Sequence, residues 1–298
     1  MIKVRVPATS ANMGPGFDSL GIAVSLYNYF GFRETEGGLS FSGFPEEFCN
    51  EDNIVYQSMM KCFEKAKYTP KGLEICSLDQ NIPIARGLGS SSSCIVGGLV
   101  GANKIMGNVF TKDELFQMAV EIEGHPDNVA PAMFGGMVVS IMDEGVSYHD
   151  IVNVKEGIKF VPMIPDFKLS TKEARAVLPK EISIKDGVYN VGRVALMVTA
   201  LSNGKYDLLK FACKDAFHEN YRSKLIKGFE EVKKEAYRVG ALATYLSGAG
   251  PTIMAITSEK EENFKTNIEK FLKEKSLNWA VHELSIDTQG AFIIEGEE

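Results

Sequence analysis

The chain has 298 residues, of which 45% are hydrophobic and 24% charged, and its formal net charge is −7. This composition is typical of a globular protein, and the length predicts two domains. The negative charge, without any basic run, argues against nucleic acid or an anionic membrane as the main partner.

Cysteine usage and the first residues indicate a cytoplasmic protein. The five cysteines are odd in number and include no Cys-x-x-Cys pair, which is typical of reduced thiols. Residues 1–6 alternate like a strand rather than resembling a signal peptide, and no apolar stretch reaches membrane-spanning length. The sequence leaves self-association as a homodimer open.

The first 80 residues predict strands and one helix, separated by glycine-containing turns. We expect a strand at 2–6, a long shaped turn at 7–21, a strand at 22–32, a hairpin turn at Gly37–Gly38, a helix at 53–68 and a strand at 73–78. Asn12 and Asp18 lie in the long turn, where their side chains have a simple alternative explanation as turn caps.

A glycine- and serine-rich loop follows the strand at 73–78 and precedes an apolar run with helical spacing. A helix start leaves backbone N–H groups unpaired, and glycine lets the backbone approach a ligand closely. The loop therefore favours a phosphate site, with a capped turn as the alternative. It matches neither the Walker nor the Gly-x-Gly-x-x-Gly pattern. Its residues are Pro83, Ile84, Ala85, Arg86, Gly87, Leu88, Gly89, Ser90, Ser91, Ser92 and Ser93.

Charged residues are dense where the next helix ends. Thr111 and Glu114 form a capping-box pattern that predicts a helix through residue 122. A polar loop with several acidic residues and a histidine follows, and Gly135–Gly136 leads into a strand at 137–142. Such loops commonly carry function, although solvated loop charge is the alternative, and the spacing fits no zinc signature.

We place the domain boundary at residues 156–157, which gives domains at 1–156 and 157–298. Capping boxes at Ser170/Glu173 and Ser258/Glu261 predict two helix starts, the second helix reaching residue 272. We expect further helices at 188–201, 207–213 and 229–239, and strands at 157–165, 241–246, 253–257, 279–286 and 291–294. A second glycine-rich turn, at 247–252, joins two of these strands.

Three separated stretches, at 7–21, 83–93 and 246–252, resemble the three motifs of the GHMP kinase superfamily in order and spacing. The first motif and residues 125–131, His-Pro-Asp-Asn-Val-Ala-Pro, resemble the homoserine kinases in particular. This resemblance implies an α+β fold with an N-terminal domain like domain 2 of ribosomal protein S5 and a ferredoxin-like C-terminal domain. It also implies ATP-dependent phosphorylation of the side-chain hydroxyl of L-homoserine to O-phospho-L-homoserine, a step toward threonine.

The resemblance also implies roles for single residues. The loop at 83–93 and Asn53 would bind ATP, and Ser91 and Glu123 would hold Mg²⁺. The catalytic group would be Glu123, Asp127, Asn128 and Thr171. L-Homoserine would be held by Asn12, Asp18, His125, Asp127, Asn128, Arg175 and Arg222. Guanidinium groups suit the substrate carboxylate and Asp18 suits its ammonium, but the sequence does not decide which arginine makes the main carboxylate contact.

The general base departs from the superfamily pattern. Mevalonate and galactose-type members use an aspartate that corresponds here to Asn128, seven positions before Gly135. An amide cannot accept the hydroxyl proton, so we expect direct in-line transfer, with the proton leaving late. Two other functions stay open: a superfamily kinase acting on a sugar, an isoprenoid alcohol or shikimate, and a catalytically silent sensor.

Overall fold

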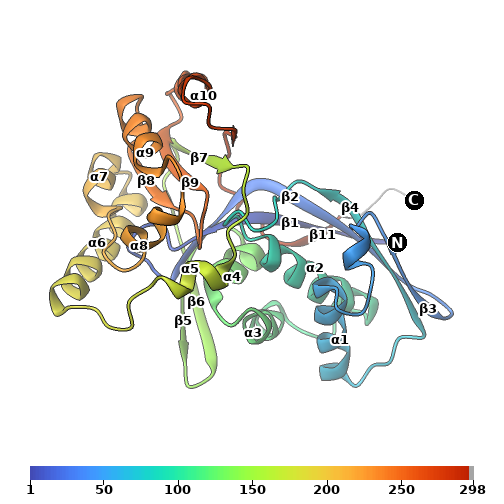
Figure 1. Cartoon of the computed structure of the whole chain (residues 1–298). Coiled ribbons are helices and arrows are strands. Elements are labelled where there is room, and N and C mark those ends of the chain that lie inside the picture. Colours follow the sequence, from blue (N-terminus) through green and yellow to red (C-terminus); the bar gives the residue numbers. More distant parts are fainter. Residues whose placement is uncertain (295–298) are drawn as a thin grey trace.

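The computed structural model describes residues 1–294, which form two sheets (Figure 1). The first sheet contains β1 (Ile2–Ala11), β2 (Leu20–Glu34), β3 (Gly38–Ser42), β4 (Gly72–Gln80), β5 (Met137–Asp143), β6 (Val146–Val152) and β11 (Phe292–Ile294). The second contains β7 (Ile158–Pro165), β8 (Ala243–Leu246), β9 (Ile253–Ser258) and β10 (Trp279–Val281). Together with the helices, these sheets give the expected α+β architecture.

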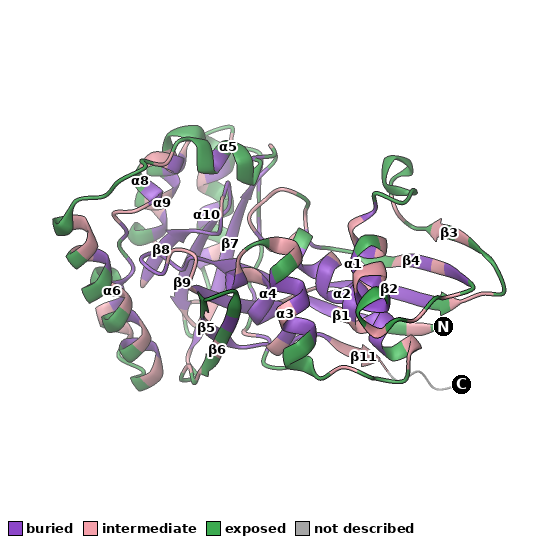
Figure 2. Ribbon diagram, turned by 90° about the horizontal axis from the view of Figure 1, so that it is seen from below, coloured by how far each residue is buried: buried purple, intermediate pink, exposed green. Residues whose placement is uncertain are grey.

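The long antiparallel pair β1–β2 forms the centre of the first sheet, whose main order is β11-β1-β2-β4-β3. β5 pairs with the start of β2, and β6 continues from β5. One face of this sheet is covered by four helices, as Figures 1 and 2 show from two directions. These are α1 (Ile54–Ala66), α2 (Ser90–Ile105), α3 (Lys112–Glu123) and α4 (Pro126–Phe134).

Glycines let α2 lie directly on β2. A Cβ atom on Gly97 would lie 2.6 Å from the ring of Phe30, and one on Gly101 would lie 2.3 Å from the ring of Phe32. Both rings are buried in the core between the sheet and the helices. Larger residues at these two positions would push the helix away, so the glycines set the distance between α2 and the sheet.

The second sheet is antiparallel, in the order β10-β7-β9-β8. Its helices are α9 (Phe229–Arg238) and α10 (Phe264–Glu274), together with α5 (Thr171–Ala176), α6 (Ile184–Asn203), α7 (Leu209–Ala212) and α8 (Glu219–Arg222). Short 3₁₀ turns occur at Glu46–Phe48, Tyr206–Leu208 and Ser223–Leu225. A core cluster combines Ile22 and Val24 of the first sheet with Phe160, Tyr245 and Met254 of the second, so the two parts share buried apolar surface.

The structure corrects several sequence-based expectations. β1 continues to Ala11 and β2 starts at Leu20, so the turn between them is shorter than residues 7–21. Gly37–Gly38 does not form a hairpin, because β3 pairs in parallel with β4. Pro126 begins α4 where a loop was expected, since proline at a first helical position lacks only an N–H that would be unpaired.

Further differences concern the second half of the chain. α10 begins at Phe264 rather than after the Ser258/Glu261 pattern, and the helix expected at 207–213 is divided between a 3₁₀ turn and α7. The strand expected at 279–286 is reduced to β10 plus isolated bridges at Leu284 and Ile286. β11 pairs with β1 in the first sheet. The domain boundary at residues 156–157 stays a prediction. β11 belongs to the second predicted domain by its position in the sequence, but it pairs in the first sheet.

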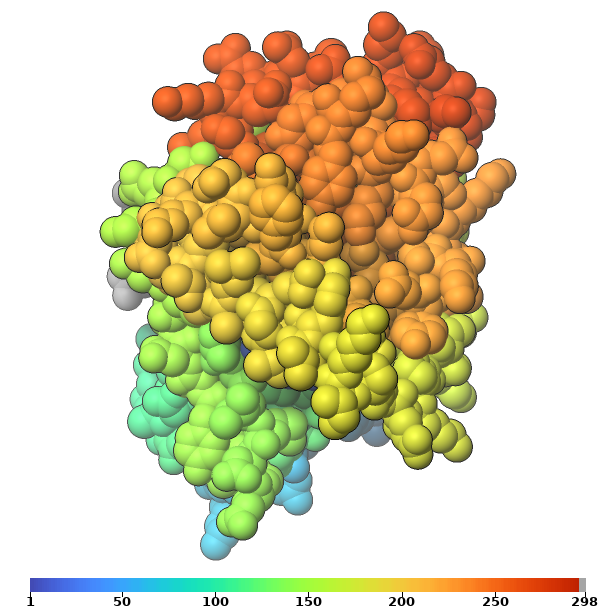
Figure 3. Space-filling view, turned by 90° about the vertical axis from the view of Figure 1, so that its left-hand side faces the viewer, coloured from blue at the N-terminus to red at the C-terminus, as the bar shows by residue number. Residues whose placement is uncertain are grey.

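The face in Figure 3 contains α6 and the β5–β6 hairpin. α6 exposes Ile184, Val188 and Val191, at helical spacing, while Met197 and Leu201 of the same helix are buried. This helix therefore has an apolar stripe that nothing covers within residues 1–294. Within the same range, no helix has the length and apolar character needed to cross a membrane.

The first prediction concerns Gly21, where β2 passes the N-terminus of α4. A Cβ atom there would lie 1.8 Å from the carbonyl oxygen of Asp127. Gly21→Ala should therefore lower the free energy of unfolding by about 1–3 kcal/mol, measured by urea denaturation. Gly37→Ala is the matched control, because a Cβ there meets nothing within 4 Å. Equal stabilities of the two variants would contradict this packing.

Candidate active site

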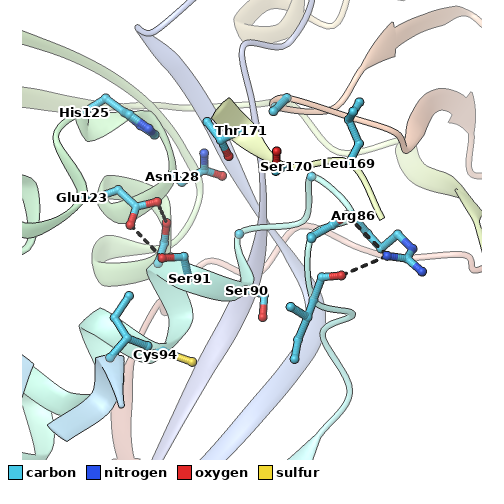
Figure 4. Close-up of a pocket in the computed structure, with 18 of the residues that line it drawn as sticks. Arg86, Ser90, Ser91, Cys94, Glu123, His125, Asn128, Leu169, Ser170 and Thr171 are labelled. Carbon is cyan, nitrogen blue, oxygen red and sulfur yellow. Dashed lines mark hydrogen bonds between the residues drawn. The ribbon is translucent and has the colours of Figure 1, made fainter. Parts of the chain in front are cut away.

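A cleft of about 420 Å³ runs between the two parts of the molecule. One wall of the cleft comes from the loop before α2, the end of α3 and the start of α4. The opposite wall comes from α5, α8 and the turn at residues 248–250. Figure 4 shows Ser90, Ser91 and Glu123 on one side of this cleft and Ser170 and Thr171 on another. Residues distant in the sequence therefore meet here.

The loop before α2 is packed tightly on both sides. A Cβ atom on Gly87 would lie 2.3 Å from the carbonyl oxygen of Ser247, and one on Gly89 would lie 2.0 Å from Thr9 Oγ1. Both glycines also have positive φ angles, +74° and +70°. They serve close packing against β1 and the second glycine-rich turn, and they let the N-terminus of α2 face the cleft.

Two serines of the run are bound to one carboxylate. Ser91 Oγ donates to Glu123 Oε2 over 3.0 Å, and Ser92 Oγ donates to Glu123 Oε1 over 3.1 Å (Figure 4). Ser91 is exposed, and Glu123 is the last residue of α3. A hydroxyl and a carboxylate are ligands that hard cations such as Mg²⁺ prefer, so this pair fits the metal that the resemblance implies.

No group of three or more His, Cys, Asp or Glu side chains suited to a metal ion occurs among residues 1–294. A cation at Ser91 and Glu123 would therefore have to complete its coordination with ligand and water oxygens. Magnesium commonly binds in this way, through one or two carboxylates and the phosphates of a substrate.

Three residues of the expected loop do not line the cleft. Leu88 is buried in the core shared by both parts, and Ser93 bonds Asn28 and the carbonyl of Ser90. Pro83 lies at the start of the loop, also outside the cleft lining. The other eight residues of the loop, from Ile84 to Gly87 and from Gly89 to Ser92, line it.

Asn53 lines the cleft as the N-cap of α1. Its Oδ1 accepts from the N–H groups of Val55 and Tyr56, and its Nδ2 donates to the carbonyl of Phe48. One amide proton is left for a ligand. Contact of Asn53 with a nucleotide stays a prediction.

Arg86 connects the loop to the second sheet. Its Nε donates to the carbonyl of Pro165 over 2.8 Å and its Nη2 to that of Asp166 over 2.6 Å, while the N–H of Leu169 donates to the carbonyl of Ala85. Burial lowers the pKa of the Arg86 guanidinium, although the charge of Asp166 opposes that effect. These bonds fix the segment before α5 to the loop.

His125 and Asp127 form an ion pair at the start of α4. His125 Nδ1 lies 2.7 Å from Asp127 Oδ1, and Asp127 is buried. Burial lowers the pKa of His125, but the hydrogen bond to Asp127 and the negative charges of Asp127, Glu123 and Asp18 outweigh burial, so its pKa is raised. The histidine therefore contributes a positive charge to the cleft more readily than a free histidine would.

Asn128 lies one residue further along α4 and faces the cleft. Its Oδ1 accepts a hydrogen bond of 2.8 Å from Thr9 Oγ1 in β1. Thr9 was not singled out from the sequence, where it falls in the turn expected at 7–21, because its contact with Asn128 joins positions distant in the sequence.

Asp18 and Arg175 bridge the two walls of the cleft. Arg175 Nη1 and Nη2 donate to the two carboxylate oxygens of Asp18 over 3.2 and 3.0 Å. The N–H of Asp18 donates to Asn12 Oδ1, whose amide nitrogen donates in turn to the carbonyl of Gly248. The bidentate geometry is the one that guanidinium groups also offer to a ligand carboxylate.

Arg222 is buried beside this pair. It donates through Nε to the carbonyl of Ala174 and through Nη1 to that of Gly248. Burial and repulsion from Arg175 lower its pKa to about 10, so it remains charged at neutral pH. The ring of Phe17 lies 5.3 Å from the Arg222 guanidinium and 5.9 Å from that of Arg175. Phe17 is a further residue that the sequence did not identify.

His218 packs against the Arg222 guanidinium group. His218 Nδ1 lies 3.3 Å from Arg222 Nη1, and its Nε2 lies 3.3 Å from the carbonyl oxygen of Gly14. Burial lowers the pKa of His218, which keeps the ring neutral and its Nδ1 able to accept from the arginine. The remaining member of the expected catalytic group, Thr171, is exposed at the first turn of α5 and lines the cleft (Figure 4).

Comparisons with known proteins agree with this architecture. Residues 53–136 match the family described as GHMP kinases N terminal domain, and residues 197–274 match GHMP kinases C terminal. A homoserine kinase of Clostridium beijerinckii is 67% identical over 296 residues, which are 99% of each chain. Another, of Clostridium botulinum, is 60% identical over 297 residues and the whole of both chains. The chain belongs to the homoserine kinase family of the GHMP kinases.

Solved structures of this superfamily have the same fold. The crystal structure of homoserine kinase from Cytophaga hutchinsonii is 30% identical to this chain, with a TM-score of 0.87, and covers 98% of this chain and 97% of its own. A mevalonate kinase from L. major, at 15% identity and a TM-score of 0.72, shares the fold alone. The expected family and fold class are therefore confirmed, whereas the roles of single site residues stay predictions.

The second prediction follows from the raised pKa of His125. The ion pair should stabilise the fold fully below the ordinary histidine pKa of 6.5, and this stabilisation should be lost as pH rises through the raised pKa. The difference in free energy of unfolding between wild type and His125→Asn, about 1 kcal/mol at low pH, should therefore shrink on going to pH 9.

His282→Asn is the control for this titration. Burial and the charge of Lys265 lower the pKa of His282. The contribution of His282 to the free energy of unfolding should therefore increase as pH rises, which is opposite to the change expected for His125. Urea denaturation at a series of pH values measures both variants. A His125→Asn effect that is constant with pH would contradict the assignment.

Proposed function

We propose that this protein transfers the γ-phosphoryl group of ATP to the side-chain hydroxyl of L-homoserine, with Mg²⁺ as cofactor. The observation that carries the proposal is the division of the cleft into two chemically different ends. One end presents the N-terminus of α2 with Ser91 and Glu123, and the other presents Asp18, Arg175 and Arg222. The family relationship supports ATP as the phosphoryl donor.

The phosphate end can hold an anion although the whole chain is acidic. Unpaired N–H groups at the start of α2 and the helix dipole attract phosphate oxygens, and the glycines keep that surface accessible. Ser91 and Glu123 would hold Mg²⁺, which supplies charge neutralisation on the phosphate oxygens when it is bound. Glu123 itself is kept in place by two serine hydroxyls.

The opposite end suits an α-amino acid. A substrate carboxylate can bind Arg175 and Arg222, which lie close enough for each to repel the other's charge. A substrate ammonium can bind Asp18. In the structure Asp18 and Arg175 satisfy each other, so a zwitterion would replace one ion pair by two. An isoprenoid alcohol offers no group for these charges, which favours the amino acid.

The chemical step needs positioning more than a base. The substrate hydroxyl oxygen forms a bond to the γ-phosphorus, the bond from that phosphorus to the bridging oxygen breaks, and ADP leaves with the electron pair. Asn128 lies in the cleft but cannot take the hydroxyl proton. Asp127 is buried and bound to His125. We therefore assign the proton to an oxygen of the transferred phosphoryl group, late in the step.

Self-association as a homodimer stays a prediction. The exposed apolar stripe on α6, formed by Ile184, Val188 and Val191, supports it, since monomeric proteins rarely leave such stripes uncovered.

The third prediction tests substrate and metal together. ADP release should be selective for L-homoserine in a panel with D-homoserine, L-threonine, L-serine, mevalonate, galactose and shikimate, and EDTA should abolish it. Glu123→Gln should lower kcat by roughly 10²-fold and Ser91→Ala by about tenfold, because both weaken charge neutralisation. Glu121→Gln is the matched control on the same helix, where it pairs with Lys61 outside the cleft.

Two outcomes of this panel would change the proposal. Turnover with another alcohol would keep the phosphate end and withdraw the substrate residues. Binding of ATP without turnover of any alcohol would favour the silent sensor.

The fourth prediction concerns Asp127. We expect Asp127 to position His125 rather than to act as a base. The wild-type pH–rate profile should then contain no acidic limb from this carboxylate, and Asp127→Asn should lower kcat without changing the shape of the profile. The measurement is kcat between pH 5 and pH 9 at saturating substrates. A wild-type limb with a carboxylate pKa that disappears in Asp127→Asn would establish a general base.

A further inference from the structure

Thr9 lies where the phosphate loop and the start of α4 approach each other. It belongs to β1 and is completely buried. Its N–H donates to the carbonyl of Leu88 in the loop over 3.2 Å, and its hydroxyl donates to Asn128 Oδ1 over 2.8 Å. One residue therefore bonds both to the backbone that would hold ATP and to the amide that would face the substrate hydroxyl.

The packing around the Thr9 hydroxyl leaves little freedom. A Cβ atom on Gly89 would lie 2.0 Å from Thr9 Oγ1, so the backbone of the loop is in close contact with the oxygen. The side chain of Thr9 also has the restricted χ1 freedom of a β-branched residue. The hydroxyl is thus held between Gly89 and Asn128. A displacement of either residue would require the other to move.

The bond fixes the orientation of the Asn128 amide, with its oxygen toward Thr9. An asparagine amide offers an acceptor oxygen and two N–H donors. Thr9 takes one of the two acceptor positions of the oxygen, and the Asn128 amide nitrogen makes no hydrogen bond within residues 1–294, so both of its N–H donors remain for a ligand. Asn128 lines the cleft, and Figure 4 shows its amide on the side where Thr171 lies. A ligand oxygen would therefore meet N–H donors.

We propose that Thr9 is a positioning residue, which orients Asn128 so that its amide donates hydrogen bonds to reacting oxygens in the cleft. This inference rests on the phosphoryl transfer proposed above. Donors fixed in advance stabilise the charge of a transferring phosphoryl group without reorganisation during the step. An amide free to rotate would present its oxygen part of the time, which would repel that charge.

The test compares three variants of Thr9 in steady-state kinetics. Thr9→Val removes the hydroxyl at nearly constant volume and should lower kcat about 10–100-fold with little change in KM for ATP. Thr9→Ser restores the donor and should keep kcat within about threefold of wild type. If Thr9→Val does not fold, Thr9→Ala removes the hydroxyl without adding a methyl group and carries the same expectation.

A double-mutant cycle distinguishes positioning from general damage. In an Asn128→Ala background the Thr9→Val change should lower kcat less than twofold further, because its target amide is gone. Thr257→Val is the matched control, since Thr257 has a buried hydroxyl without a partner among residues 1–294 and lies outside the cleft. An unchanged kcat in Thr9→Val, or full additivity with Asn128→Ala, would overturn the proposal.

The outcome remains separable from the substrate assignment. If the wild type phosphorylates a different alcohol, the same variants are compared with that alcohol. If it phosphorylates none, amide orientation can be read by NMR from nuclear Overhauser effects between the Thr9 methyl and the Asn128 side-chain amide protons. These should be weak in wild type, and a strong effect would overturn the proposal.

Discussion

The close approach of the loop before α2 to its two neighbours is the constraint on which the cleft depends. Gly87 touches the carbonyl of Ser247, and Gly89 touches the hydroxyl of Thr9. The loop is therefore held between β1 of the first sheet and the turn after β8 of the second. Because both contacts leave no room for a side chain, the position of the α2 N-terminus is set by backbone packing. The ends of α3 and α4 are then placed relative to it by the shared helix layer.

Electrostatics in this cleft are local rather than global. The net charge of −7 does not attract an anion such as ATP, so the proposed anion binding has to rely on N–H groups at a helix start and on two guanidinium groups. Arg222 is kept charged although buried, with carbonyls of Ala174 and Gly248 around it. His218 behind it is neutral, which avoids a third cation. The same hydrogen-bonded network thus keeps Arg222 charged and the adjacent His218 neutral.

Sequence reasoning predicted several of the elements that line this cleft, because the signals for them are local. Capping boxes located α3 and α5, and the glycine and serine run located the start of α2. The family resemblance brought residues such as Asp18 and Arg175 together, which no local pattern could do. Thr9 and Phe17 were not singled out because the contacts that distinguish them, with Asn128 and with Arg175 and Arg222, join positions distant in the sequence. The start of α4 at Pro126 was missed because a proline reads equally well as a helix end or as a first helical residue.

The pairing of β11 with β1 has a consequence for folding. Lys3 is the neighbour of Ile294, so the first sheet closes its edge with a strand made at the far end of the chain. During synthesis from the N-terminus, residues 1–294 must leave the ribosome before this ladder can form. Until then, the outer side of β1 presents unpaired backbone groups, as any free strand edge does. The nascent chain is therefore exposed to wrong partners at this edge for longer than at any local pairing in the molecule, such as β5 with β6.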